Sequence, residues 1–104
     1  MYTRISEWPR ETVEYLSVII EGDDNLATYT VAMQVLPHGT RPAAGAWQAA
    51  AWDTDQSGNT IAKVLIGPGT SFDFSAAPGV VVPWVKITAL PEVPVLEGDP
   101  IRIT

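Results

Sequence analysis

The chemically active side chains of this chain are few, and they form no recognised catalytic pattern. The 104 residues include one histidine, His38, and no cysteine. His38 stands in the turn-like sequence Pro37-His38-Gly39, and a general base needs a positioned nucleophile, which no motif here supplies. The absence of cysteine excludes disulfides, thiolate zinc sites and cysteine nucleophiles together. We therefore predict that His38 is a solvent-facing loop residue and that the protein is not an enzyme.

The carboxylates offer two candidate sites, and neither pattern is complete. Asp53 to Gly58 (DTDQSG) places side-chain oxygens at alternate positions before a glycine, as a calcium loop begins. The twelfth position is Val64 instead of a bidentate glutamate, so we interpret the segment as a hairpin turn without metal. An ion shared with the acidic segment 21–24 is the alternative. An acid pair for glycoside hydrolysis would come from Asp73, Glu92, Glu97 or Asp99. All four lie in turn-like contexts, so we expect no cofactor and no catalysis.

Composition and charge narrow the class of partner. Twelve acidic and six basic residues give a formal net charge of −6, and the basic residues are scattered along the chain. Binding to phosphates needs clustered Lys and Arg, so nucleic acid is excluded as a partner. No stretch approaches the ~20 apolar residues that span a bilayer. The first apolar run also lacks a basic leader, so we expect a soluble protein without a signal peptide or a membrane partner.

The apolar runs predict strands rather than helices. They are rich in β-branched and aromatic residues and are separated by nine prolines and eight glycines. Strands are expected at 13–20, 26–36, 46–53, 60–66, 80–90 and 100–104, with a short further strand at 71–75. About six to seven such strands, with frequent turns, are typical of an all-β, immunoglobulin-like Greek-key β-sandwich. Residues 1–12, where Pro9 interrupts strand pairing, are predicted to be an extended N-terminal arm before a single domain over 13–104.

Alternation of apolar and polar residues predicts which side of a strand faces the core. In the strand over 26–36, the inward residues are Tyr29, Val31, Met33 and Val35. In the strand over 80–90, the inward residues are Val85, Ile87 and Ala89. The closing strand is expected to point Ile101 and Ile103 inward.

Trp8, Pro9 and Trp84 are the predicted partner-binding residues. Trp84 shares strand parity with Lys86, which predicts an outward ring next to Pro83, and Trp8 lies in the arm beside Pro9. An exposed tryptophan beside a proline is a frequent anchor for a protein partner or a sugar ring. In the alternative interpretation, the arm or the loop over 91–99 covers Trp84.

The other two tryptophans, Trp47 and Trp52, lie in the predicted strand over 46–53. They have opposite parity along it, so they can face one core only if a bulge separates them. We expect one of them to fill the core.

Short motifs along nearly the whole chain carry a family resemblance. They are WPRETVEYLSV at 8–18, GTRP at 39–42, KVLIGPG at 63–69 and PWVKITALPEVPVLEGDPIRIT at 83–104. With these motifs the chain resembles small immunoglobulin-like virion structural proteins of tailed phages that infect actinobacteria. It departs from them at Gly79-Val80-Val81, where such proteins run a glycine-tyrosine into the late strand. A tyrosine corner is therefore not expected.

The resemblance implies a non-enzymatic virion protein that is assembled in the host cytoplasm. It would dock in multiple copies at the head–tail connector or on the capsid surface. Its partners would be capsid, portal, connector or tail proteins and copies of itself. The alternative function is a carbohydrate- or receptor-binding β-sandwich module, for which the chain offers only Asn25 and Asn59 as asparagines, both in turns.

Overall fold

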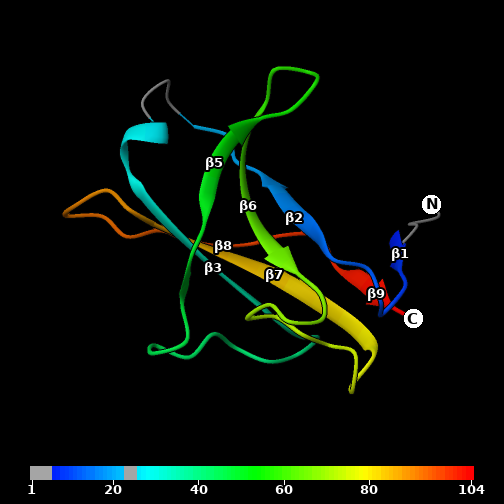
Figure 1. The fold of residues 1–104 in the computed structure, drawn as a ribbon. Helices are drawn as coiled ribbons and strands as arrows, with labels where there is room; N and C mark the ends of the chain where they lie inside the picture. Colours follow the sequence, from blue (N-terminus) through cyan, green and yellow to red (C-terminus); the bar gives the residue numbers. More distant parts are fainter. Residues whose placement is uncertain (1–5, 23–25) are drawn as a thin grey trace, which may run out of the picture.

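The structure is a computed structural model, and it describes residues 6–22 and 26–104 (Figure 1). The described strands are β1 (Ser6–Trp8), β2 (Glu14–Ile19), β3 (Thr30–Pro37), β4 (Gln48–Ala49), β5 (Ala51–Thr54), β6 (Thr60–Ile66), β7 (Gly79–Thr88), β8 (Val95–Glu97) and β9 (Ile101–Ile103). A short 3-10 helix, η1, spans Leu26–Thr28. Within these residues, no helix has the length and apolar character needed to cross a membrane.

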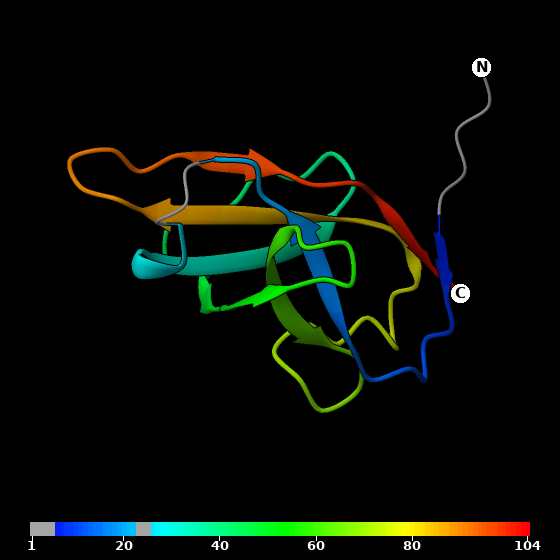
Figure 2. The ribbon, with the colours of Figure 1, turned by 90° about the horizontal axis from the view of Figure 1, so that it is seen from above.

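Two sheets form the frame of the protein. The larger sheet has the order β1-β9-β7-β3-β4, with β8 also paired to β7, and the smaller sheet has the order β2-β6-β5. Figure 2 shows them as two layers, with β3, β7 and β8 on one side and β5 and β6 on the other. The protein is therefore all-β, as predicted, and its two sheets are compatible with a β-sandwich.

The core lies between the sheets and is filled by alternate residues of their strands. Its buried members on the longer strands are Val31, Met33 and Val35 of β3, Val81, Val85 and Ile87 of β7, Leu16 of β2, and Ala62, Val64 and Ile66 of β6. Ile101 and Ile103 of β9 are buried there too, while Tyr29 and Ala89 pack against the core half-buried. The predicted inward faces are thus confirmed.

Residues 46–53, predicted as one strand, form parts of two strands in different sheets. β4 pairs with β3 in the larger sheet, and β5 pairs with β6 in the smaller one. Between them, the Ala50 N–H donates to the Val31 carbonyl at 3.1 Å. The chain therefore crosses between the sheets at Ala50, as strands do at the corner of a sandwich. This crossing gives Trp47 and Trp52 different environments.

Two short strands lie where none was predicted, and one predicted strand is absent. β1 lies within the predicted arm and pairs in parallel with β9, so residues 6–8 belong to the larger sheet. β8 lies in the proline-rich segment after β7, and its side chains are all exposed, which removes any alternating signal. Residues 71–75 form no strand, although Phe72 is buried in the core from this loop.

We predict that Met33→Asp destabilises the protein by roughly 3 kcal/mol or more, because it places a carboxylate at a fully buried core position. Urea unfolding followed by tryptophan fluorescence measures the change. Thr30→Asp, on an exposed position of the same strand, is the control and should cost less than about 1 kcal/mol. Equal stability of the two variants would contradict the assignment of the faces.

Candidate functional site

Trp84 is buried, so its predicted exposure is wrong. It lies on the side of β7 that faces away from the core, as its parity indicates, but only 8% of it is exposed. The Arg41 guanidinium lies 5.0 Å from the centre of its ring in a cation–π contact. Arg41, in the connection after β3, therefore contributes to this cover, and Glu97 of the segment over 91–99 is the direct strand neighbour of Trp84. Trp84 Nε1 has no hydrogen-bond partner among the described residues.

Gln34 fixes the segment that covers Trp84. It is the direct neighbour of Trp84 across the β3–β7 ladder, and it is fully buried. Its amide nitrogen donates to the Ala43 carbonyl at 2.8 Å, and its amide oxygen accepts from the Ala43 N–H at 3.4 Å. One side chain therefore satisfies both backbone groups of Ala43 and holds the 38–47 connection against the larger sheet. Sequence alternation alone assigns Gln34 to a polar face and misses this role.

Trp8 and Pro9 lie where the first strand meets the last. Trp8 is half-buried at the end of β1, and its carbonyl accepts from the Thr104 N–H at 2.8 Å. Pro9 is exposed and begins a turn in which its carbonyl accepts from the Thr12 N–H at 3.0 Å. Trp8 and Trp84 lie on strands separated by β9 in the sheet order. They therefore do not combine into one aromatic site.

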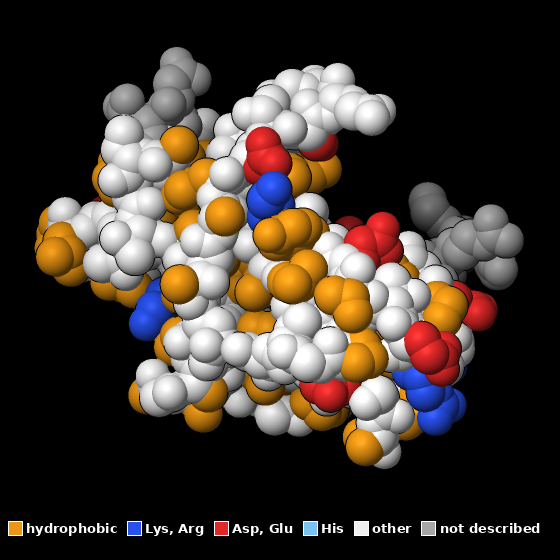
Figure 3. All heavy atoms as spheres, in the orientation of Figure 1, with side chains coloured by type: hydrophobic (Ala, Val, Ile, Leu, Met, Phe, Trp, Pro, Cys, Tyr) orange, Lys and Arg blue, Asp and Glu red, His pale blue; other side chains and the backbone are white. Residues whose placement is uncertain are grey.

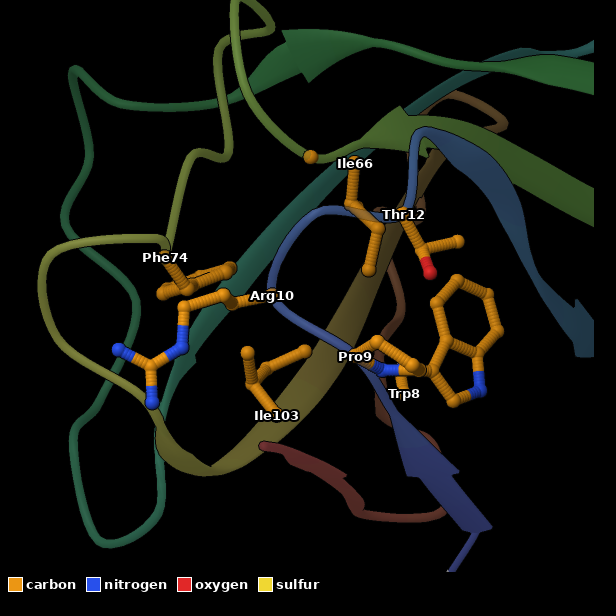
Figure 4. A pocket seen from close by; sticks show the side chains of 8 residues that line it. Trp8, Pro9, Arg10, Thr12, Ile66, Phe74 and Ile103 are labelled. Atoms are coloured by element: carbon orange, nitrogen blue, oxygen red, sulfur yellow. The ribbon is translucent and has the colours of Figure 1, made fainter.

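The hollow beside Trp8 is too small for an organic ligand. Trp8, Ile66, Phe74 and Ile103 surround it (Figure 4), and its volume is about 10 Å³. This is about the space of one water molecule. Gly67 closes one side with a φ of 125°, and a Cβ there would overlap the Thr12 carbonyl. Trp8 and Pro9 thus fasten the N-terminal segment to its own domain in this structure.

Trp47 and Trp52 occupy opposite sides of the larger sheet. The Lys86 amino group lies 5.1 Å from the Trp47 ring centre, on the side away from the core. Trp52 packs against the core and donates its Nε1 hydrogen to the Tyr29 carbonyl at 2.8 Å. Trp52 is therefore the tryptophan that contributes to the core.

The segment over 53–58 has the geometry of a hairpin turn. One Asp55 carboxylate oxygen accepts from the N–H groups of Ser57 and Asn59, both at 2.9 Å, and the other accepts from Asn59 Nδ2 at 3.1 Å. The bonds from the Asn59 backbone and side chain lower the pKa of Asp55. Among the described residues, no group of three His, Asp or Glu could hold a metal ion. Part of the acidic segment over 21–24 lies outside the described residues.

The remaining predicted acid–base residues are dispersed. His38 is exposed, and its backbone N–H donates to the Val80 carbonyl at 3.0 Å. The Asp73 carboxylate accepts from the Ser75 hydroxyl at 2.7 Å and the Ser75 N–H at 3.0 Å, and these bonds lower its pKa. Glu97 and Asp99 both border a groove between β2 and the segment after β8, whereas Glu92 lies in the turn after β7.

The outer face of the smaller sheet carries apolar side chains that the sequence analysis did not single out. Tyr15, Ile19 and Leu65 are 53%, 56% and 37% exposed. Tyr15 pairs with Leu65 across the β2–β6 ladder, and Ile19 pairs with Ile61, which is itself buried. Figure 3 shows hydrophobic side chains gathered over β2 and β6 on this face. We call these four residues the apolar face. In residues 13–20, apolar side chains occur at both odd and even positions, so both sides of the strand are partly apolar. This pattern is the signal that could have revealed the apolar face.

An ion pair lies within the apolar face. Lys63 Nζ lies 2.7 Å from Asp53 Oδ2 and 4.6 Å from the Tyr15 ring centre. The hydrogen bond from Lys63 lowers the pKa of Asp53, and the same bond raises the pKa of Lys63. The aliphatic stem of Lys63 thereby continues the apolar surface between Tyr15 and the ion pair.

Comparison with known proteins adds no relative. A scan against protein-family models found no match, and searches among curated proteins and solved structures also found none. The resemblance to phage virion proteins therefore stays a prediction.

We predict that Gln34→Met destabilises the protein by about 1–3 kcal/mol, because it leaves the N–H and carbonyl of Ala43 without their partner. Gln48→Met, on an exposed position of β4, is the matched control and should change stability little. Urea unfolding measures both variants. If the two variants were equally stable, the Gln34 amide would contribute nothing to holding the connection.

We also predict that the effect of Asp55→Asn on the melting temperature depends on pH. The pKa of Asp55 is lowered in the folded protein, so its carboxylate contributes stability above its unfolded pKa of about 3.9. That contribution is lost as the pH falls through the folded-state pKa. The variant should melt below the wild type at pH 7, and the gap should close in acid. Glu92→Gln, which removes a negative charge from another turn, is the control. If the difference in melting temperature between Asp55→Asn and the wild type stayed constant with pH, the prediction would be contradicted.

Proposed function

We propose that this chain is a non-enzymatic structural protein of a tailed-phage virion. Its two sheets would form an immunoglobulin-like Greek-key sandwich that docks in multiple copies at the head–tail connector or on the capsid surface. The observation that carries the docking role is the apolar face on the smaller sheet, where Tyr15 and Leu65 are exposed as direct neighbours and Ile19 is exposed further along β2. The resemblance in sequence motifs supports the virion as its location.

The apolar face has the composition of a docking surface. An exposed aromatic residue stands next to aliphatic ones on two paired strands, and exposed patches of this kind mark sites of protein association. The strands beneath are anchored to the core by Leu16, Ala62 and Val64, so the backbone that carries the apolar face is held in place. The Lys63–Asp53 pair next to them gives a partner a fixed pair of charges to match.

The alternative function, carbohydrate or receptor binding, has less support. A sugar site presents exposed aromatic rings with hydrogen-bonding side chains around them. Trp84 is buried, Trp52 packs against the core, and Trp8 is half-buried against its own domain. Trp47 is occupied by the Lys86 contact. The indole rings of this chain therefore pack mainly against its own residues and do not form an exposed platform for a sugar.

We predict that a gold-labelled antibody against this chain binds purified phage particles from the source lysate. Electron microscopy locates the label. A cluster where head meets tail would indicate a connector, label over the shell a decoration protein, and label at the tail tip would favour receptor or sugar binding. Intact and opened particles that both stay unlabelled, with an antibody that recognises the free protein, would refute the virion role.

A pair of variants then tests the apolar face itself. Leu65→Glu should greatly reduce the amount of this protein on particles, because it places a charge next to Tyr15 in the apolar face. Leu90→Glu makes the same change at a residue that is 78% exposed and lies outside that face. Circular dichroism of both purified variants checks that they fold. Equal incorporation of the two variants would assign docking to another surface.

A further inference from the structure

A groove of about 680 Å³ runs along β2 on the open side of the sandwich and shares Tyr15 and Ile19 with the apolar face. One wall is Tyr15 to Ile19 of β2, at the edge of the smaller sheet. The opposite wall is the segment from Glu97 to Ile101, which joins β8 to β9 in the larger sheet. Ser6 and Trp8 of β1 close one end.

The β2 wall presents unpaired backbone groups. The Ile20 N–H donates to the Thr60 carbonyl at 2.9 Å, and hydrogen-bonded pairs alternate along an antiparallel ladder. Val18, Leu16 and Glu14 therefore bond to β6. The N–H and carbonyl groups of Tyr15, Ser17 and Ile19 point the other way, where no described strand pairs with them. Three backbone donors and three backbone acceptors therefore face the groove, at the spacing that pairing with an additional strand requires.

The opposite wall is acidic and firmly placed. Glu97 and Asp99 line it, and no Lys or Arg of the described residues lines the groove. Between the two acids, the Gly98 N–H donates to the Pro83 carbonyl at 2.8 Å. A Cβ on Gly98 would lie 3.0 Å from both Val18 Cγ2 and Pro83 Cγ, so the segment packs closely against both sheets. The two walls are therefore fixed relative to each other before anything binds.

We propose that this groove binds an extended segment of a partner protein, which adds to β2 as a further strand and places Lys or Arg side chains against Glu97 and Asp99. Backbone pairing with Tyr15, Ser17 and Ile19 supplies affinity, and the acidic wall selects basic side chains. The proposal goes beyond the docking role above and does not depend on where the protein resides.

A second copy of this chain fits the groove less well than a basic segment. Antiparallel pairing of two β2 edges would bring the acidic walls of both copies to the same seam. Each wall carries Glu97 and Asp99 with no basic residue beside them in the groove. Like charges brought together disfavour that pairing, and the chain already carries a net charge of −6.

Selection from a displayed library of random peptides, each slightly longer than β2, tests the proposal. We expect the selected peptides to carry Lys or Arg at every second position, with apolar residues between them. Synthetic copies labelled with a fluorophore should bind in anisotropy titrations, and the binding should weaken as salt is added. In hydrogen-exchange NMR, the amides of Tyr15, Ser17 and Ile19 should become protected when peptide is present.

Two sets of variants link binding to the groove. Ser17→Pro removes one of the three free N–H groups without touching the β6 ladder, and should weaken peptide binding by about tenfold or more. Thr54→Pro, on the outer edge of β5 at the other side of the same sheet, is its control; it removes the bond from the Thr54 N–H to Asp53 Oδ1, outside the groove, and should leave peptide binding unchanged. Glu97→Gln with Asp99→Asn keeps the backbone edge and should weaken binding by about threefold or more. Glu92→Gln, outside the groove, should not.

Each contrary result overturns the proposal. Failure to select any peptide, or peptides without basic residues, would remove the proposed partner. Binding that survives both the Ser17→Pro change and the Glu97/Asp99 changes would place the peptide elsewhere. A dimer of the wild-type protein in sedimentation that Ser17→Pro abolishes would make a second copy the occupant. None of these results would alter the labelling of particles, so the two proposals fail separately.

Discussion

The pairing of β3 with β7 is the interaction on which the other elements depend. The two strands pair along the whole of β3, from Thr30 opposite Thr88 to Pro37 opposite Val81. One side of this ribbon supplies Met33 and Val85, which are fully buried in the core between the sheets. Its opposite side is also covered, because Gln34 holds Ala43 and Arg41 stacks on Trp84. A strand pair that is packed on both sides is a stable template. The shorter strands β4, β8 and β9 can therefore add to it, although each has only two or three residues.

The smaller sheet has a different character because only its inner side is covered. β2 and β6 place Leu16, Ala62 and Val64 in the core, and Trp52 of β5 packs against it, while Tyr15 and Leu65 remain on the outer face. The edge of β2 is likewise open toward the groove. The smaller sheet therefore provides the apolar face and one wall of the groove, while the opposite wall, with Glu97 and Asp99, joins β8 to β9 of the larger sheet.

Strand positions with strict alternation could be predicted from the sequence, and those without it could not. The inward set around Met33 and Val85 follows from period-two patterns, since one side of each strand faces the core. β1 and β8 are too short for such a pattern, and their partners lie far along the chain or in an irregular segment. Trp84 was misplaced because alternation tells which side a residue faces and not whether a loop covers that side. The apolar face and the groove were missed because they depend on which strand lies at a sheet edge, and that is a property of pairing between distant segments.

The parallel pair of β1 and β9 determines how the described part of the chain responds to pulling. Ser6 lies opposite Ile101, and Trp8 lies opposite Ile103, with the Thr104 N–H bonded to the Trp8 carbonyl. The two strands lie side by side at one end of the molecule in Figures 1 and 2. Tension applied before Ser6 and after Ile103 acts along both strands in opposite directions. Because the strands are parallel, this force shears the whole pair at once, instead of opening its hydrogen bonds one after another, and so the short pairing works as a mechanical clamp between the first and last strands.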